Sequence, residues 1–121
     1  MKTDILNESD ISRWLHAFYA KLLVDPVTAP KFEGLDLEAH MPRIEAFWAF
    51  VLLEKEGYRT NVFEKHAHLH LEPQHFETWI KHFTETTDEM FEGPNAEIAK
   101  QRARLLATTF LHKLSGEYRM F

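Results

Sequence analysis

The stretch from Glu64 to Trp79 is Glu-Lys-His-Ala-His-Leu-His-Leu-Glu-Pro-Gln-His-Phe-Glu-Thr-Trp, and it holds four of the chain's eight histidines. Its proline suits the first turn of a helix, where a missing N–H costs nothing. A helix over residues 73–92 is expected to follow, with an inward stripe of Phe76, Trp79, Ile80, Phe83 and Met90. The histidines pose the functional question: one holds an iron, several hold a zinc, or none holds anything.

Three more helices are expected around this stretch, over residues 8–24, 36–56 and 96–115. Their expected caps are Asn7, Asp36 and Asn95, and their expected ends are Asp25-Pro26, Gly57 and Gly116. Their expected inward residues are Ile11, Trp14, Leu15, Phe18, Leu22 and Leu23; Leu37, Met41, Ile44, Phe47, Trp48, Val51 and Leu52; and Ile98, Leu105, Leu106, Phe110 and Leu114. Without a repeat or a credible strand, the sequence predicts an all-α fold of two antiparallel helix pairs joined by the histidine segment.

Composition limits the possible functions. A chain of 121 residues, 45% apolar and 27% charged, is expected to form one globular domain over residues 1–121. A formal net charge of −5 without a basic run argues against nucleic-acid binding. Because the chain has no cysteine, disulfides, iron–sulfur clusters and thiolate ligands are excluded, and any metal must bind nitrogen or oxygen.

No apolar stretch in the sequence approaches the roughly 20 residues that a membrane-spanning helix needs. The first eight residues also lack the apolar core of a signal peptide. We therefore expect a cytoplasmic protein without a membrane span.

Zinc is one possible cofactor. In a helix, His66 and His70 would face the same way, as paired zinc ligands do. The residues between them, Ala67, His68 and Leu69, do not include the glutamate that a metalloprotease helix requires. The zinc hypothesis therefore rests on the histidine pair alone.

Three polar groups fall on otherwise apolar helix faces: the phenol of Tyr19, the imidazole of His40 and the indole of Trp79. Burying such a group without a partner costs about 1–3 kcal/mol, so a polar ligand between the helix pairs would satisfy them. A purely structural explanation remains open, in which Tyr19 is a core-edge tyrosine bonded to a backbone carbonyl and His40 lies half-exposed in a first turn.

Several short motifs occur in a specific order: Phe18-Tyr19, Asp25-Pro26, Pro30-Lys31-Phe32, His40 followed by Ile44 and Phe47-Trp48, Lys65-His66, and Pro73-Gln74-His75-Phe76 leading to Trp79. In this order and spacing, the chain resembles the group III truncated haemoglobins of bacteria over nearly its whole length. It also lacks the glycine pairs that mark other truncated branches.

The resemblance implies a truncated globin fold, a sandwich of two helix pairs around haem b. It aligns His66 with the proximal iron ligand and Tyr19, His40 and Trp79 with the polar distal residues. Candidates for contact with the haem are Phe18, Ile44, Phe47 and Phe76 as apolar walls, and Arg59 and Lys65 near the propionates. His68, His70 and His75 are not ligands in this alignment, and we expect them beside the site or at the surface.

The function implied by the resemblance is binding of dioxygen, nitric oxide and carbon monoxide. Polar distal donors favour slow release of dioxygen, so redox or nitric oxide chemistry is expected rather than storage. Nitric oxide dioxygenation or peroxidase-like turnover would need a separate reductase, and the chain is expected to be a monomer or weak dimer. His40 is either a hinged distal donor or an iron ligand itself. The alternative is a helical sensor or interaction domain that is haem-free or binds zinc.

Overall fold

The computed structural model describes residues 1–55 and 72–114, the last four of them for the backbone alone. Its elements are α1 (Glu8–Val24), the short 3-10 helix η1 (Ala29–Phe32), α2 (Leu37–Leu53), α4 (Pro73–Met90) and α5 (Pro94–Leu114). No strand occurs in these two ranges. The predicted all-α class is therefore confirmed.

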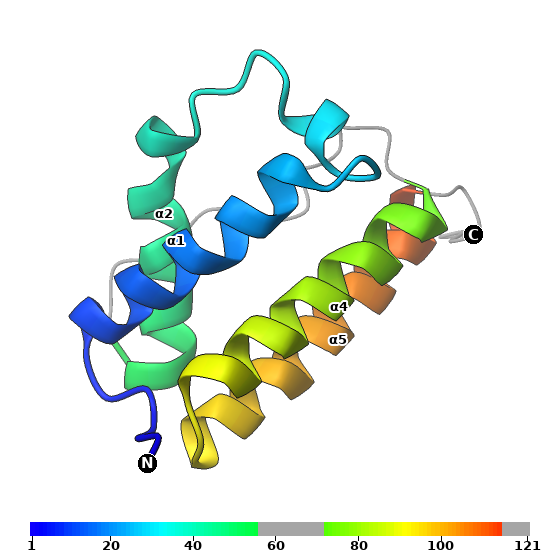
Figure 1. Ribbon diagram of the computed structural model, residues 1–121. Coiled ribbons are helices and arrows are strands. Elements are labelled where there is room, and N and C mark those ends of the chain that lie inside the picture. Colours follow the sequence, from blue (N-terminus) through cyan, green and yellow to red (C-terminus); the bar gives the residue numbers. More distant parts are fainter. Residues whose placement is uncertain (56–71, 115–121) are drawn as a thin grey trace.

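The helices form two pairs, as the sequence predicts. Helices α4 and α5 lie side by side and run in opposite directions, while α1 contacts α4 and crosses α2 (Figure 1). Helix α2 also contacts α5, so the two helix pairs pack against each other through two contacts, α1 with α4 and α2 with α5. The segment predicted to join the pairs, with His66, His68 and His70, lies outside the described residues.

Two of the three predicted caps are confirmed. Asn7 accepts a hydrogen bond from the backbone N–H of Asp10 at 2.8 Å and begins α1. Asp36 accepts from the N–H of Ala39 at 3.3 Å and begins α2. Side-chain oxygens at these positions satisfy N–H groups that the first helical turn leaves without partners.

The predicted cap Asn95 is wrong, because α5 already begins at Pro94. The cap comes from the other end of the chain: the Asp4 carboxylate accepts from the N–H groups of Asn95 and Ala96, both at 2.9 Å. Asn95 instead donates its side-chain amide to the carbonyl of Ile5 at 2.7 Å. A carboxylate at a helix N-terminus is also favoured by the helix dipole.

Two predicted helix ends fall short. Helix α2 stops at Leu53 rather than at residue 56, because Glu54 adopts a left-handed conformation with φ of 58°. The predicted stop, Gly57, lies outside the described part of the chain. Helix α4 stops at Met90, where Phe91 turns to extended backbone and becomes buried.

Phe83 is the centre of the core. All three tryptophans pack on its ring, with centroid distances of 5.1 Å for Trp14, 5.2 Å for Trp48 and 5.3 Å for Trp79. Trp14 also donates its indole N–H to Thr87 at 3.0 Å. The aromatic side chains therefore bind α1, α2 and α4 together, each ring pair adding about 0.5–1.5 kcal/mol beyond burial.

The predicted inward face of α5 is partly wrong. Ile98 and Leu105 are 42% and 61% exposed. The buried stripe is instead made of small side chains, Ala96, Ala99, Ala103 and Ala107. Alanines let a helix approach its neighbours more closely than bulky residues do. Helix α5 therefore packs against its neighbours through this face of small side chains. Leu23 of α1, also predicted inward, is 44% exposed.

No helix in the described ranges is both long enough and apolar enough to span a bilayer.

Candidate functional site

Tyr19 and Trp79 are directly joined. The Trp79 indole interacts with the Tyr19 phenol as a hydrogen-bond donor, and both rings contact Phe18, which links α1 to α4. Burial raises the pKa of Tyr19, and this bond partly opposes the rise. The phenol is therefore protonated at neutral pH. Because an indole N–H can only donate, Tyr19 is the acceptor in this bond and keeps its own hydrogen for another acceptor.

Aromatic rings surround this pair. The ring of Phe18 lies 4.9 Å from that of Tyr19 and 5.6 Å from that of Trp79, measured between centroids. Phe32 of η1 meets Tyr19 edge-on at 6.1 Å. These contacts restrict how the phenol and the indole can turn, so the polar pair lies in a defined position within an apolar region.

Helix α2 has two apolar faces. One face is buried in the core and carries Met41, Trp48 and Leu52. The other carries His40, Ile44, Phe47 and Val51, which are only partly buried. These four residues follow one another at spacings of four, three and four, so they form one stripe along the helix. The stripe begins with the imidazole and continues with apolar side chains.

Phe76 is also predicted at the site. It is buried in the first turns of α4, three residues before Trp79, but outside the main cluster of core side chains. Next to it, His75 is buried and its Nδ1 accepts from the backbone N–H of Glu72 at 2.8 Å. His75 therefore helps to cap α4, which the sequence did not indicate.

The remaining predicted site residues, His66, Arg59 and Lys65, lie outside the described residues. The same holds for His70, the second residue of the zinc hypothesis. Within residues 1–55 and 72–114, no three histidine or acidic side chains converge in a way that would hold a metal ion.

Comparison with known proteins identifies the family of this helical arrangement. No protein-family model matches the chain. The group 3 truncated hemoglobin ctb of Campylobacter jejuni is 29% identical over 126 residues, which cover 96% of this chain and 99% of that protein. The crystal structure of the group III truncated hemoglobin from Campylobacter jejuni has a TM-score of 0.84 and 28% identity, and covers 99% of this chain and all of that one. The chain is similar in sequence and structure to the group III truncated hemoglobins and has the truncated globin fold.

In this truncated globin, several polar contacts between helices were not predicted, and two of them involve a histidine that joins α1 to a neighbouring helix. The first joins Asp25, at the end of α1, to His82 of α4: its carboxylate Oδ2 lies 2.7 Å from Nε2 of the imidazole. The sequence signal was Asp25-Pro26, which marked the end of α1 but gave no partner. A contact across 57 residues has no periodic pattern in sequence.

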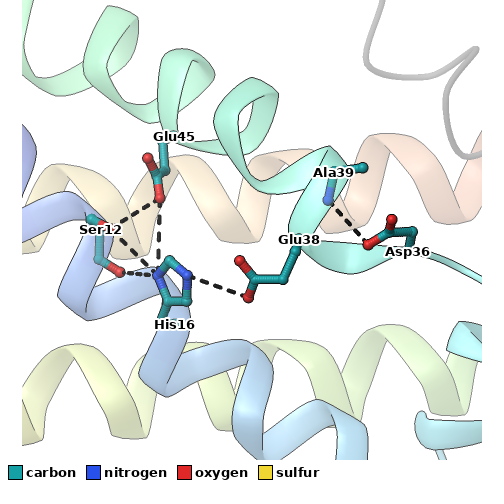
Figure 2. Close-up of polar contacts among 6 residues, drawn as sticks. All are labelled: Ser12, His16, Asp36, Glu38, Ala39 and Glu45. Carbon is teal, nitrogen blue, oxygen red and sulfur yellow. Dashed lines mark hydrogen bonds and ion pairs between the residues drawn. The ribbon is translucent and has the colours of Figure 1, made fainter.

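The second contact joins α1 to α2 at the surface of the truncated globin (Figure 2). His16 donates Nδ1–H to the carbonyl of Ser12 at 2.7 Å, so its Nε2 faces the carboxylate of Glu38, 3.7 Å away. The hydroxyl of Ser12 donates to Glu45 at 3.1 Å. These groups are largely exposed, and exposed pairs contribute about 0–1 kcal/mol each. They fasten α1 to the first half of α2.

A surface cleft lies between α1 and α2, lined by Glu8, Ile11, Pro42, Glu45, Ala46 and Ala49. By the helical repeat, the α2 residues of this cleft are on the side of the helix opposite His40 and Ile44. None of the predicted site residues within 1–55 and 72–114 lines it. The cleft is therefore separate from the candidate site of this truncated globin.

Proposed function

We propose that this truncated globin binds haem b between its two helix pairs and holds a diatomic ligand, dioxygen, nitric oxide or carbon monoxide, beside Tyr19. The observation that carries the proposal is the pairing of Tyr19 with Trp79 inside an aromatic surround. Because an indole N–H can only donate, this pairing leaves the phenol O–H for a further acceptor. A ligand that carries partial negative charge is such an acceptor.

The described residues fit a flat apolar group. The partly buried stripe of α2 carries an imidazole and then apolar side chains. It has no carboxylate, whose charge would disfavour contact with a porphyrin. Phe18, Ile44, Phe47 and Phe76 would supply apolar contacts on this account. Haem would supply an iron that could bind a protein side chain and a diatomic ligand.

His66 is proposed as the proximal ligand, and Arg59 and Lys65 as cationic groups near the propionates. These roles come from the family resemblance, because all three residues lie outside the described part of the chain. An imidazole is the usual axial ligand of globins, and the absence of cysteine excludes thiolate ligation.

On the distal side, the geometry favours different roles for Tyr19 and Trp79. Because the indole N–H is already donated to the phenol, Tyr19 would donate to the ligand and Trp79 would hold Tyr19 in place. His40 heads the stripe of α2 and is partly buried. It would act either as a second donor or as an axial ligand in a resting state.

Firm retention of dioxygen suits redox chemistry better than delivery. We propose nitric oxide dioxygenation or peroxidase-like turnover as the reaction class, with electrons from a separate reductase.

The visible spectrum of the full-length protein with one equivalent of hemin tests the proposal. We expect a strong Soret band, and ferric, ferrous and carbonyl spectra typical of histidine ligation. A chain that remains without a Soret band after reconstitution would instead be a haem-free domain or a zinc protein. A zinc titration then separates those two.

Replacement of the proximal residue gives the matched test. His66→Ala is expected to abolish stable haem binding and leave the far-UV circular dichroism largely unchanged. The control variants His68→Ala and His70→Ala should keep haem. If His66→Ala keeps haem with an unchanged axial-ligand spectrum, the proximal role belongs to His68 or His70.

A further inference from the structure

The Asp25–His82 pair lies close to Tyr19 and Trp79 on both helices. His82 follows Trp79 by three residues in α4, which is one turn further along the same side. Asp25 ends α1, whose last two turns also contain Tyr19. The carboxylate and the imidazole are 2.7 Å apart and shielded, with side chains 22% and 15% exposed.

The protonation of His82 follows from its partner. An ionised carboxylate can only accept, so Nε2 of His82 carries the hydrogen of this bond. The other ring nitrogen, Nδ1, is buried and has no hydrogen-bond partner within the described residues. The orientation of the imidazole is therefore set by Asp25.

Asp25 is itself held firmly. Its second carboxylate oxygen accepts from the N–H of Val27 at 2.8 Å. Its backbone carbonyl accepts from the N–H groups of Thr28 and Ala29 at 3.1 and 2.8 Å. Asp25 is therefore held in place at the end of α1. Its bond to His82 fixes the position of α4 relative to α1.

Apolar packing alone would not fix α4 this closely. The Phe18–Phe83 contact, with centroids 5.1 Å apart, tolerates small shifts along the helix axis because hydrophobic attraction is non-directional. The 2.7 Å bond between Asp25 and His82 does not, because hydrogen bonds weaken steeply with misalignment. A further polar bridge between α1 and α4, from Lys21 to Glu89 at 2.8 Å, ends on a side chain that is 61% exposed.

We propose that Asp25 and His82 are a positioning pair that holds the indole of Trp79, one turn earlier in α4, beside the phenol of Tyr19 in α1. The pair acts through Trp79 and does not touch the ligand. Its effect on ligand retention rests on the proposed function, but its effect on the indole does not.

The three indole N–H groups of the chain provide the test. Their ¹⁵N–¹H cross-peaks and hydrogen exchange are measured in the full-length protein, with any haem in the diamagnetic ferrous carbonyl form. Trp79→Phe assigns the relevant peak. In His82→Leu, we expect the Trp79 indole to shift and exchange at least tenfold faster. Trp14, which bonds Thr87 of the same helix, should change by less than twofold.

Two variants separate positioning from general stability. His82→Gln places an amide N–H near Nε2 and should restore the Trp79 peak and its exchange rate to nearly those of the parent. Glu89→Gln removes the Lys21 bridge between the same helices and should leave Trp79 unchanged. An unmoved Trp79 peak in folded His82→Leu, or equal acceleration of Trp14 and Trp79, would overturn the proposal.

A second variant covers the case in which His82→Leu does not fold. Asp25→Asn keeps one oxygen for Val27 but places an amide NH₂ opposite Nε2 of His82. The contact with His82 then loses the carboxylate charge, so a selective acceleration of Trp79 by about threefold is expected. Equal exchange in parent and Asp25→Asn would count against the pair. With haem bound, dioxygen should leave His82→Leu faster and His82→Gln at the parental rate. A chain that takes up no haem would defeat the proposed function and leave the indole result standing.

Discussion

Two regions of this truncated globin use polar groups in opposite ways. At the N-terminal clasp, Thr3 to Ile5 lie against the α4–α5 turn, and the N-terminus meets that turn in Figure 1. Asp4 caps two N–H groups of α5, Ile5 is fully buried, and the N–H of Glu92 donates to the carbonyl of Thr3 at 2.9 Å. Every one of these groups has its partner inside the protein.

At the distal corner, formed by Tyr19, Trp79 and the stripe beginning at His40, the polar groups are only partly buried. The phenol receives one hydrogen bond and keeps its own hydrogen. The clasp therefore contributes to stability, whereas under the proposed function the corner keeps bonding capacity for a ligand. Changes at the clasp should alter unfolding, and changes at the corner should alter ligand dissociation.

The largest expected effect is at Gly93 of the clasp. Its φ is +149°, and an added Cβ would lie 2.5 Å from Cγ of Asp4. Gly93→Ala should lower the free energy of unfolding by about 3 kcal/mol, because backbone strain and the displaced cap add. Urea denaturation measures this. The control is Gly34→Ala, also at positive φ but with nothing within 4 Å, where about 1 kcal/mol is expected. Equal losses would show that Asp4 contributes nothing.

Removal of the cap itself should have the next largest effect. Asp4→Ala leaves the N–H groups of Asn95 and Ala96 without their acceptor, so we expect a loss of about 1–2 kcal/mol in urea denaturation. Asp4→Asn keeps one oxygen and should lose about half as much. Neither variant should alter haem spectra. A changed spectrum would contradict the proposed difference between the clasp, which affects stability, and the corner, which affects the ligand.

The distal corner should respond in kinetics rather than stability. Tyr19→Phe removes the proposed donor and should accelerate dioxygen dissociation more than tenfold, about 1.4 kcal/mol. Trp79→Phe acts through Tyr19 and should accelerate it about threefold to tenfold. Stopped-flow displacement by carbon monoxide measures both rates. Unchanged rates in both variants would show that hydrogen bonding by these two residues does not control dioxygen release. A larger effect for Trp79→Phe would show that the indole is the direct donor.

The smallest effect concerns the acid range. The hydrogen bond from His82, followed by that from the N–H of Val27, lowers the pKa of Asp25 below its ordinary value of 3.8. This contribution to stability is therefore present above that value and is lost as the pH falls through the lowered pKa. Urea midpoints of the parent and Asp25→Asn should differ near pH 6 and converge towards pH 2. A difference that stays constant down to pH 2 would contradict the assignment.

Local signals predicted much of the fold. The start and end of α1, the caps Asn7 and Asp36, and Pro73 at the start of α4 all depend on residues within one or two turns. Apolar periodicity also placed Phe83 and the three tryptophans inward. Tyr19 was predicted at the edge of the buried face, and it is partly buried there.

Hydrophobic periodicity gave the wrong inward residues where the larger apolar side chains are not the buried ones. On α5 it selected Ile98 and Leu105, although the helix packs on its alanines. A sequence pattern ranks residues by hydrophobicity, but the distance between two helices decides which side chains fit.

By itself, the sequence determined four helices, their order, and which side chains could bring chemistry to the space between them. Only the tertiary structure decided that Trp79 donates to Tyr19, that Asp4 caps α5 and that Asp25 binds His82. The physical reason is separation along the chain. A helix cap or an apolar stripe is settled by neighbours a few residues away, whereas these bonds join groups more than fifty residues apart, whose approach depends on the packing of whole helices.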